Sequence, residues 1–151
     1  MSDDESARVT PPPVHVPDAV IRIDETPAPS LFERIGGRLA VESLVDHLYD
    51  GIEADPALRP LFPADLTAAR LRQQWFFEEW LGGERRFTAH RGSPRLRQRH
   101  LPFAISRHSA ERWLRHMQTA LTASEVDSAT ASEIMQGLRP LARHFVNTSD
   151  E

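Results

Sequence analysis

Cysteine and lysine are both absent from the 151-residue sequence. Without cysteine, a disulfide framework, a zinc–thiolate site and a cysteine nucleophile are excluded. Without lysine, Schiff-base chemistry and the lysine of a phosphate-binding loop are excluded as well. The sequence also lacks any long apolar run, so we expect neither a membrane span nor the core of a signal peptide. These absences favour a cytoplasmic protein without a membrane partner.

Charge and proline are concentrated near the N-terminus. Residues 1–29 hold six acidic residues and two arginines, which gives a net charge of -4, and six of the 12 prolines. Proline removes backbone donors and disfavours helical geometry in the residue before it. We therefore predict an acidic, proline-rich, disordered tail over residues 1–29. The following residues, 30–148, are long enough to form one folded domain.

Apolar residues recur at helical spacing over most of that domain. The pattern predicts helices over about 39–54, from Asp65 or Thr67 to Trp80, from Ser106 to about Leu121, and over about 128–147. Residues 84–95 are predicted to form a polar, turn-rich connection. No strand is predicted, so the expected fold class is all-α.

Seven histidines are an excess for a chain of this size. His90 lies in the predicted polar connection, and His108 and His116 lie eight residues apart on one predicted helix. These two could in principle bind a metal ion, but one pair makes only half a site. We therefore expect all three of these histidines to be exposed surface residues.

His100 differs from the other histidines. It ends a short helical turn just before Pro102, and apolar residues that include Leu96 and Phe103 surround it. Pro102 is tolerated only in the first turn or at the end of a helix, so His100 is held near a break in the chain. Taken alone, this pattern fits either a buried histidine with satisfied hydrogen bonds or a ligand.

An arginine run precedes His100. It consists of Arg91, Arg95, Arg97 and Arg99. One interpretation is a phosphate-binding stripe for nucleic acid, but residues 30–151 carry no net charge and the run contains no exposed aromatic residue. Arginine also pairs well with carboxylates, because the planar guanidinium group matches that anion with two hydrogen bonds. The run alone leaves open whether such carboxylates belong to the protein or to a ligand.

Three hydrogen-bonding side chains lie on apolar helix faces. They are Tyr49, which is the only tyrosine, Gln73 and Trp113. Aromatic residues at helical spacing usually belong to a core, but a buried phenol or indole also needs a hydrogen-bond partner. Their presence on three separate helices favours a mostly apolar pocket with a few polar groups directed into it.

The order of these features resembles the truncated haemoglobins, and within them group II. The resemblance covers about residues 30–147. It rests on Leu31-Phe32-Glu33-Arg34-Ile35-Gly36-Gly37, Tyr49, Leu61-Phe62-Pro63, Trp80-Leu81-Gly82-Gly83, the stretch from Arg91 to Phe103, and Trp113. It implies a two-over-two helical sandwich around haem b. It also implies reversible binding of dioxygen and of other diatomic ligands such as NO and CO.

Position by position, the resemblance also implies roles around the cofactor. His100 matches the residue whose imidazole nitrogen binds the iron. Phe62 matches an aromatic residue that wedges against the haem face, and Arg72 matches an arginine that meets a haem propionate. With the neighbours of His100, Leu96 and Phe103, these residues form the expected cofactor-binding set.

On the ligand side, Tyr49 and Trp113 match residues whose O–H and N–H groups donate to the bound gas. Ala69 stands where many globins have a distal histidine or glutamine. Its methyl group donates nothing, so we expect ligand stabilisation to shift to Tyr49, Trp113 and Gln73. Phe62 also departs from the pattern, because many members of the group carry tyrosine at its position.

Two other classes of function remain open from the sequence. A haem-dependent redox enzyme, acting as a nitric-oxide dioxygenase or a peroxidase, would need an external reductase as a partner. A helical module that binds a protein or a nucleic acid through residues 91–99 would be colourless after expression with ample haem. We expect no nucleic-acid partner, and we favour an oxygen-binding protein over a dedicated enzyme.

Overall fold

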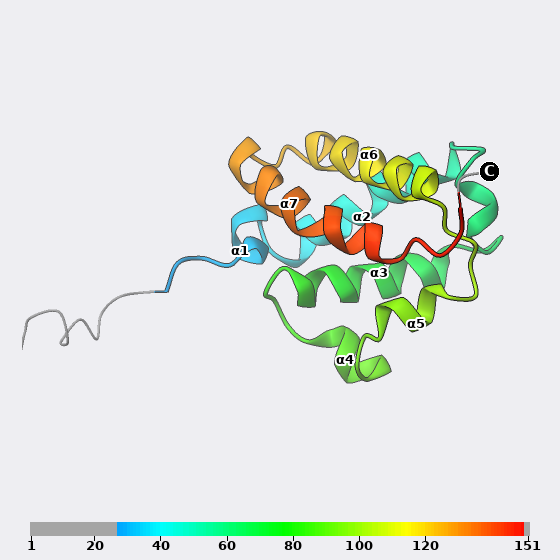
Figure 1. Cartoon of the computed structure of the whole chain (residues 1–151). Helices are drawn as coiled ribbons and strands as arrows, with labels where there is room; N and C mark the ends of the chain where they lie inside the picture. Colours follow the sequence, from blue (N-terminus) through cyan, green and yellow to red (C-terminus); the bar gives the residue numbers. More distant parts are fainter. Residues whose placement is uncertain (1–26, 150–151) are drawn as a thin grey trace, which may run out of the picture.

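Helices make up most of the described part of the chain, residues 27–149 of a computed structural model (Figure 1). In chain order they are α1 (Leu31–Ile35), α2 (Arg38–Glu53), the short 3-10 helix η2 (Arg59–Leu61), α3 (Thr67–Trp80), α4 (Arg86–Arg91), α5 (Leu96–His100), α6 (Arg107–Ala123) and α7 (Ser128–His144). Residues 27–149 contain no strand, which confirms the all-α class. The predicted disordered tail, apart from residues 27–29, lies outside the described residues.

Local sequence explains where several helices begin. The side chains of Ser30, Ser106 and Asp127 each accept a hydrogen bond from the backbone N–H three residues further on, at 3.0 to 3.2 Å. Such bonds satisfy donors that the first turn of a helix leaves without an intrahelical partner. Gly36 ends α1 with a φ of 114°, a conformation that favours glycine. The start of α6 at Ser106 is confirmed.

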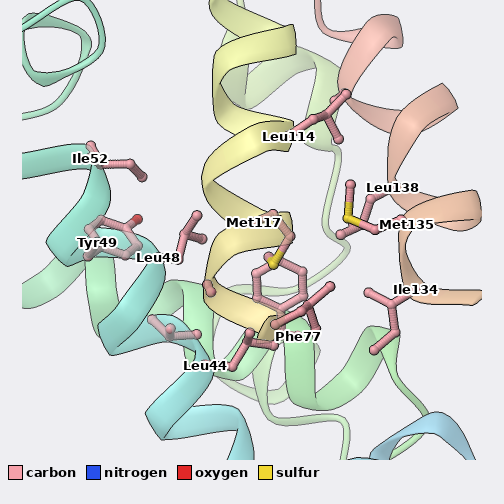
Figure 2. Close-up of a cluster of buried hydrophobic side chains, with 14 of the residues drawn as sticks. Leu44, Leu48, Tyr49, Ile52, Phe77, Leu114, Met117, Ile134, Met135 and Leu138 are labelled. Atoms are coloured by element: carbon pink, nitrogen blue, oxygen red, sulfur yellow. The ribbon is translucent and has the colours of Figure 1, made fainter. Parts of the chain in front are cut away.

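The core lies where the four long helices meet. Helix α2 packs against α3 and α6, and α6 also packs against α7. Figure 2 shows side chains from these helices converging: Leu44, Leu48 and Ile52 from α2, Phe77 from α3, Leu114 and Met117 from α6, and Ile134 and Leu138 from α7. All of them are buried. This arrangement is the predicted two-over-two sandwich.

One part of the predicted architecture is wrong. Residues 84–95 are not simply a polar connection, because α4 occupies Arg86–Arg91 and buries Phe87. The Phe87 ring packs edge-on against Phe76, with the ring centroids 6.0 Å apart. Helix α4 spans less than two turns and buries one side chain, so it leaves no periodic pattern to detect. The short helix α1 is not predicted from the sequence either.

Two of the histidines predicted as simple surface residues make specific contacts. His90 lies in α4, and its ring stacks on Trp75 with the ring centroids 4.2 Å apart, although the residue remains exposed. His116 is half-buried, and its Nε2 lies 2.7 Å from a carboxylate oxygen of Asp55. The prediction of an exposed His116 is therefore wrong, because this hydrogen bond holds the ring against the buried Asp55. His108 is exposed, as predicted.

The packing at Gly137 of α7 leads to a test of stability. A Cβ atom at this position would lie 2.8 Å from Cζ2 of Trp80, a distance that forces the ring to move. We expect Gly137→Val to lower the free energy of unfolding by about 2 kcal/mol, the usual cost of overpacking. Urea denaturation measures the change.

The control is Ser132→Val, which adds the same side chain at an exposed position of the same helix. We expect it to change the free energy of unfolding by less than about 0.5 kcal/mol. Equal losses in the two variants would show that the contact with Trp80 does not limit position 137.

Candidate functional site

A cavity of about 510 Å³ lies among the helices. Its volume is within the usual range of ligand and cofactor sites. Apolar side chains form most of its wall, and they come from every helix except α1. All nine predicted site residues line this one cavity: Tyr49, Phe62, Ala69, Arg72, Gln73, Leu96, His100, Phe103 and Trp113. The structure thus brings together side chains that are up to 64 residues apart in the sequence.

His100 is fixed in orientation by two contacts. Its Nδ1 lies 2.6 Å from the carbonyl oxygen of Leu96. Because a carbonyl only accepts, Nδ1 carries the proton and donates it, which leaves the lone pair of the ring on Nε2. The ring also stacks on Phe145, with the centroids 4.1 Å apart and an interplanar angle of 4°. The imidazole is therefore held in the tautomer that can bind a metal ion through Nε2.

The chain on either side of His100 explains why α5 is so short. Arg95 precedes the helix with a φ of 40°, a left-handed conformation that separates α5 from the preceding loop. Pro102 prevents the helix from continuing. The Arg99 side chain donates from Nε to the carbonyl of Pro94 at 2.7 Å and from Nη2 to the carbonyl of Arg91 at 3.1 Å. These bonds hold the loop before α5 against the helix that carries His100.

Three arginines line the cavity, and we call Arg72, Arg91 and Arg99 the arginine rim. Within residues 27–149, none of them forms an ion pair with a carboxylate, whereas Arg38, Arg70 and several others do. Desolvation, followed by the positive charges of Arg99 and Arg72, lowers the pKa of Arg91. Like charges gathered without a counter-charge make this rim a site for an anion with carboxylate or phosphate groups.

Polar side chains from α2 and α6 also line the cavity. Tyr49 is buried, and its hydroxyl donates a long hydrogen bond of 3.4 Å to the carbonyl of Ala69. Its ring meets Phe62 edge-on, with the centroids 5.9 Å apart. Trp113 stacks on Phe77, and its indole N–H makes no hydrogen bond within residues 27–149. The cavity therefore holds O–H and N–H donors that are bound weakly or not at all by the protein.

Some lining residues were not found by sequence reasoning. Phe145 is the clearest case, because it lies 45 residues after His100 and yet stacks directly on its ring. Phe76 and Phe87 also line the cavity. Their sequence signal is only that of ordinary core residues. The stacking of Phe145 on His100 depends on the end of α7 lying beside α5, which no local pattern encodes.

Comparison with known proteins points in one direction. The family described as bacterial-like globin matches residues 30–147. The Group 2 truncated hemoglobin YjbI of Bacillus subtilis is 36% identical over 119 residues, which cover 79% of this chain and 89% of the relative. The crystal structure of the group II truncated hemoglobin of Bacillus anthracis matches with a TM-score of 0.81 at 38% identity, covering 83% of this chain and 97% of the other. The structure of a truncated oxygen-avid haemoglobin from Bacillus subtilis gives a TM-score of 0.76 at 35% identity. The match covers 79% of this chain and 100% of the other.

Fold and site together define a haem-binding globin of the truncated, two-over-two class. The chain belongs to the bacterial-like globin family, and its resemblance to the group II truncated haemoglobins is confirmed. Among residues 27–149, no helix combines the length and the apolar character needed to cross a membrane.

The residues of the cavity fit the haem that this family implies. A haem presents a flat apolar face, an iron and two carboxylates. The aromatic and aliphatic walls suit the face, the Nε2 lone pair of His100 suits the iron, and the arginine rim suits the carboxylates. The donor set is that of a haem site rather than of a site for a bare metal ion. Within the described residues, no group of three or more His, Asp or Glu side chains could hold such an ion.

The burial of Tyr49 leads to a second test. Burial raises the pKa of this phenol to about 12, although the charges of Arg72 and Arg70 lower it in part. In an unfolded chain the pKa of the phenol is about 10. The stabilisation from the neutral phenol is therefore complete below about pH 10 and is lost as the pH rises towards 12.

Because Tyr49 is the only tyrosine, an alkaline titration of tyrosinate absorbance reports this one side chain. We expect little ionisation at about pH 11 in the folded protein and a midpoint near 10 in denaturant. The Tyr49→Phe variant supplies the baseline. Titration of the folded protein near pH 10 would contradict a buried phenol.

Proposed function

We propose that this protein holds haem b through Nε2 of His100 and reversibly binds dioxygen and other diatomic ligands such as NO and CO. The observation that carries the proposal is the hydrogen bond from His100 Nδ1 to the Leu96 carbonyl, inside a cavity with apolar walls. When bound, haem would supply an iron that takes a nitrogen ligand from the protein and a diatomic gas. A cytoplasmic location stays a prediction from the sequence.

The cofactor would be retained by charge and by apolar contact. Arg72, Arg91 and Arg99 would pair with the two propionates, and Phe62 and Phe103 would pack on the macrocycle. Two arginines of the run before His100, Arg91 and Arg99, line the cavity. This placement favours the carboxylates of a cofactor over the phosphates of a nucleic acid as the partner of the run.

The ligand would be held by the donors of Tyr49, Trp113 and Gln73. The Tyr49 hydroxyl gives up little when it turns to a ligand, because its bond to Ala69 is long. Ala69 thus takes part through its carbonyl group rather than its side chain. Each additional hydrogen bond to the gas would slow its escape, by about tenfold for 1.4 kcal/mol. The truncated haemoglobin from Bacillus subtilis whose structure has been solved is oxygen-avid, which supports dioxygen as the ligand here.

Substitution of the proposed axial ligand tests the assignment directly. We expect His100→Ala, reconstituted with haem, to lose the Soret position and the ligand-binding spectrum of the wild type, because the proposed nitrogen ligand of the iron is removed. The matched control is His47→Ala, which removes an exposed imidazole from α2 outside the cavity. It should leave the spectrum unchanged. A wild-type spectrum in His100→Ala would rule out His100 as the ligand.

A second substitution tests the ligand side. Trp113→Phe keeps an aromatic ring against Phe77 but removes the indole donor. We expect dioxygen to dissociate about tenfold faster, the effect of one lost hydrogen bond, with little change in Tm. Stopped-flow measurement of the dissociation rate checks this.

The control for that variant is Trp75→Phe, which removes an indole that does not line the cavity. Its dissociation rate should match that of the wild type. If Trp113→Phe also dissociates at the wild-type rate, Trp113 takes no part in holding the ligand.

A further inference from the structure

Asp55 is a buried carboxylate with a complete set of hydrogen-bond partners. It follows α2, and only 4% of its surface is exposed. Arg112 donates to both of its oxygens, from Nη2 to Oδ1 at 2.8 Å and from Nε to Oδ2 at 3.0 Å. His116 Nε2 lies 2.7 Å from Oδ2, and the backbone N–H of Ala57 lies 2.9 Å from Oδ1. These contacts hold the pKa of Asp55 well below its usual range, with the Arg112 bonds as the largest cause.

The two side-chain partners of Asp55 come from one turn of α6. Arg112 and His116 are four residues apart, so their side chains lie on the same face of that helix. Gly51 of α2 makes room for the histidine, because a Cβ atom there would lie 2.7 Å from Nδ1 of His116. The carboxylate therefore fastens the end of α2 to the middle of α6 at a close crossing.

Each of the two segments joined by Asp55, the turn after α2 and helix α6, carries an aromatic residue of the cavity. On one side, the Asp55 carbonyl accepts from the N–H groups of Leu58 and Arg59 at 3.2 and 2.8 Å, which shapes the turn that leads to Phe62. On the other side, Trp113 directly follows Arg112 in α6. Phe62 and Trp113 both line the cavity. The position of Asp55 thus affects two parts of the lining at once.

A contribution to folding stability does not by itself explain why Asp55 is buried and paired with Arg112. A buried ion pair often contributes no more to folding than apolar residues of the same volume, because both charges must leave water. What the pair does supply is geometry, since the two bonds to the planar guanidinium fix its direction as well as its distance. A geometric role is therefore the reading that the arrangement favours.

We infer that Asp55 is a positioning residue for the ligand side of the cavity. Its bonds to Arg112 and His116 set where Phe62 and Trp113 stand relative to each other. The inference rests on the proposed function, because the placement of these rings matters to a ligand only if one binds there.

The test uses the haem-loaded protein. Asp55→Asn keeps the shape of the side chain but removes its charge and one of its acceptors. At a temperature where both proteins are fully folded, we expect the dioxygen dissociation rate to change by at least about threefold. We also expect the indole N–H resonance of Trp113 to shift in the diamagnetic carbon monoxide form. This second measurement reports the position of the ring without any ligand kinetics.

Glu111→Gln is the matched control, because Glu111 lies in α6 like Arg112, and the change breaks only its exposed ion pair with Arg143 of α7. It should leave both measurements at wild-type values. Arg112→Lys is a second, milder variant that retains the charge but loses the paired bonds, and it should shift the same resonance in the same direction. It keeps the test decisive if Asp55→Asn does not fold.

A lower Tm with an unchanged dissociation rate and an unchanged Trp113 resonance would overturn the inference, because Asp55 would then act on stability alone. Failure of the proposed function looks different. In that case His100→Ala would keep the wild-type spectrum, whatever Asp55→Asn does.

Discussion

The hydrogen bond between His100 Nδ1 and the carbonyl of Leu96 is the contact on which the chemistry of the cavity depends. A neutral imidazole has one donor and one acceptor nitrogen, and the identity of each is set by its surroundings. Here the partner is a carbonyl one helical turn earlier, so the short helix α5 itself selects the tautomer. The constraint is local and needs no other part of the fold. A distant segment contributes the stacking of Phe145 on the ring and a hydrogen bond from Asn147 to the His100 carbonyl.

The arginines of the cavity differ from those that fasten helices together. Away from the cavity, several arginines meet carboxylates: Arg38 and Arg86 both contact the buried Glu78, and Arg70 lies between Asp46 and Asp50. At the cavity, the arginine rim has no carboxylate within residues 27–149. In those pairs the protein supplies both charges, whereas at the rim it supplies only one. What distinguishes the rim is that its three positive charges gather on one apolar cavity.

How well the sequence predicts a helix depends on how many turns its apolar pattern spans. Helices α2, α3, α6 and α7 span four turns or nearly so, and their apolar spacing predicts them to within a few residues. The candidate site residues were predicted because family motifs place them, and all nine lie on one cavity. Helix α4 is too short for periodicity to reveal. His116 was assigned to the surface because its partner, Asp55, lies 61 residues away.

The cavity also has a consequence for folding. Its wall includes residues from α2 to the end of α7, and several of them, among them Phe77 and Leu138, are also members of the hydrophobic core. A cofactor that binds in the cavity therefore packs against the hydrophobic core as well as supplying a reactive group. Occupancy and folding are then thermodynamically linked, with about 1.4 kcal/mol of added stability for each tenfold excess of the cofactor over its dissociation constant. The supply of iron porphyrin in the cell would thus set the fraction of this polypeptide that is folded, and not only the fraction that is active.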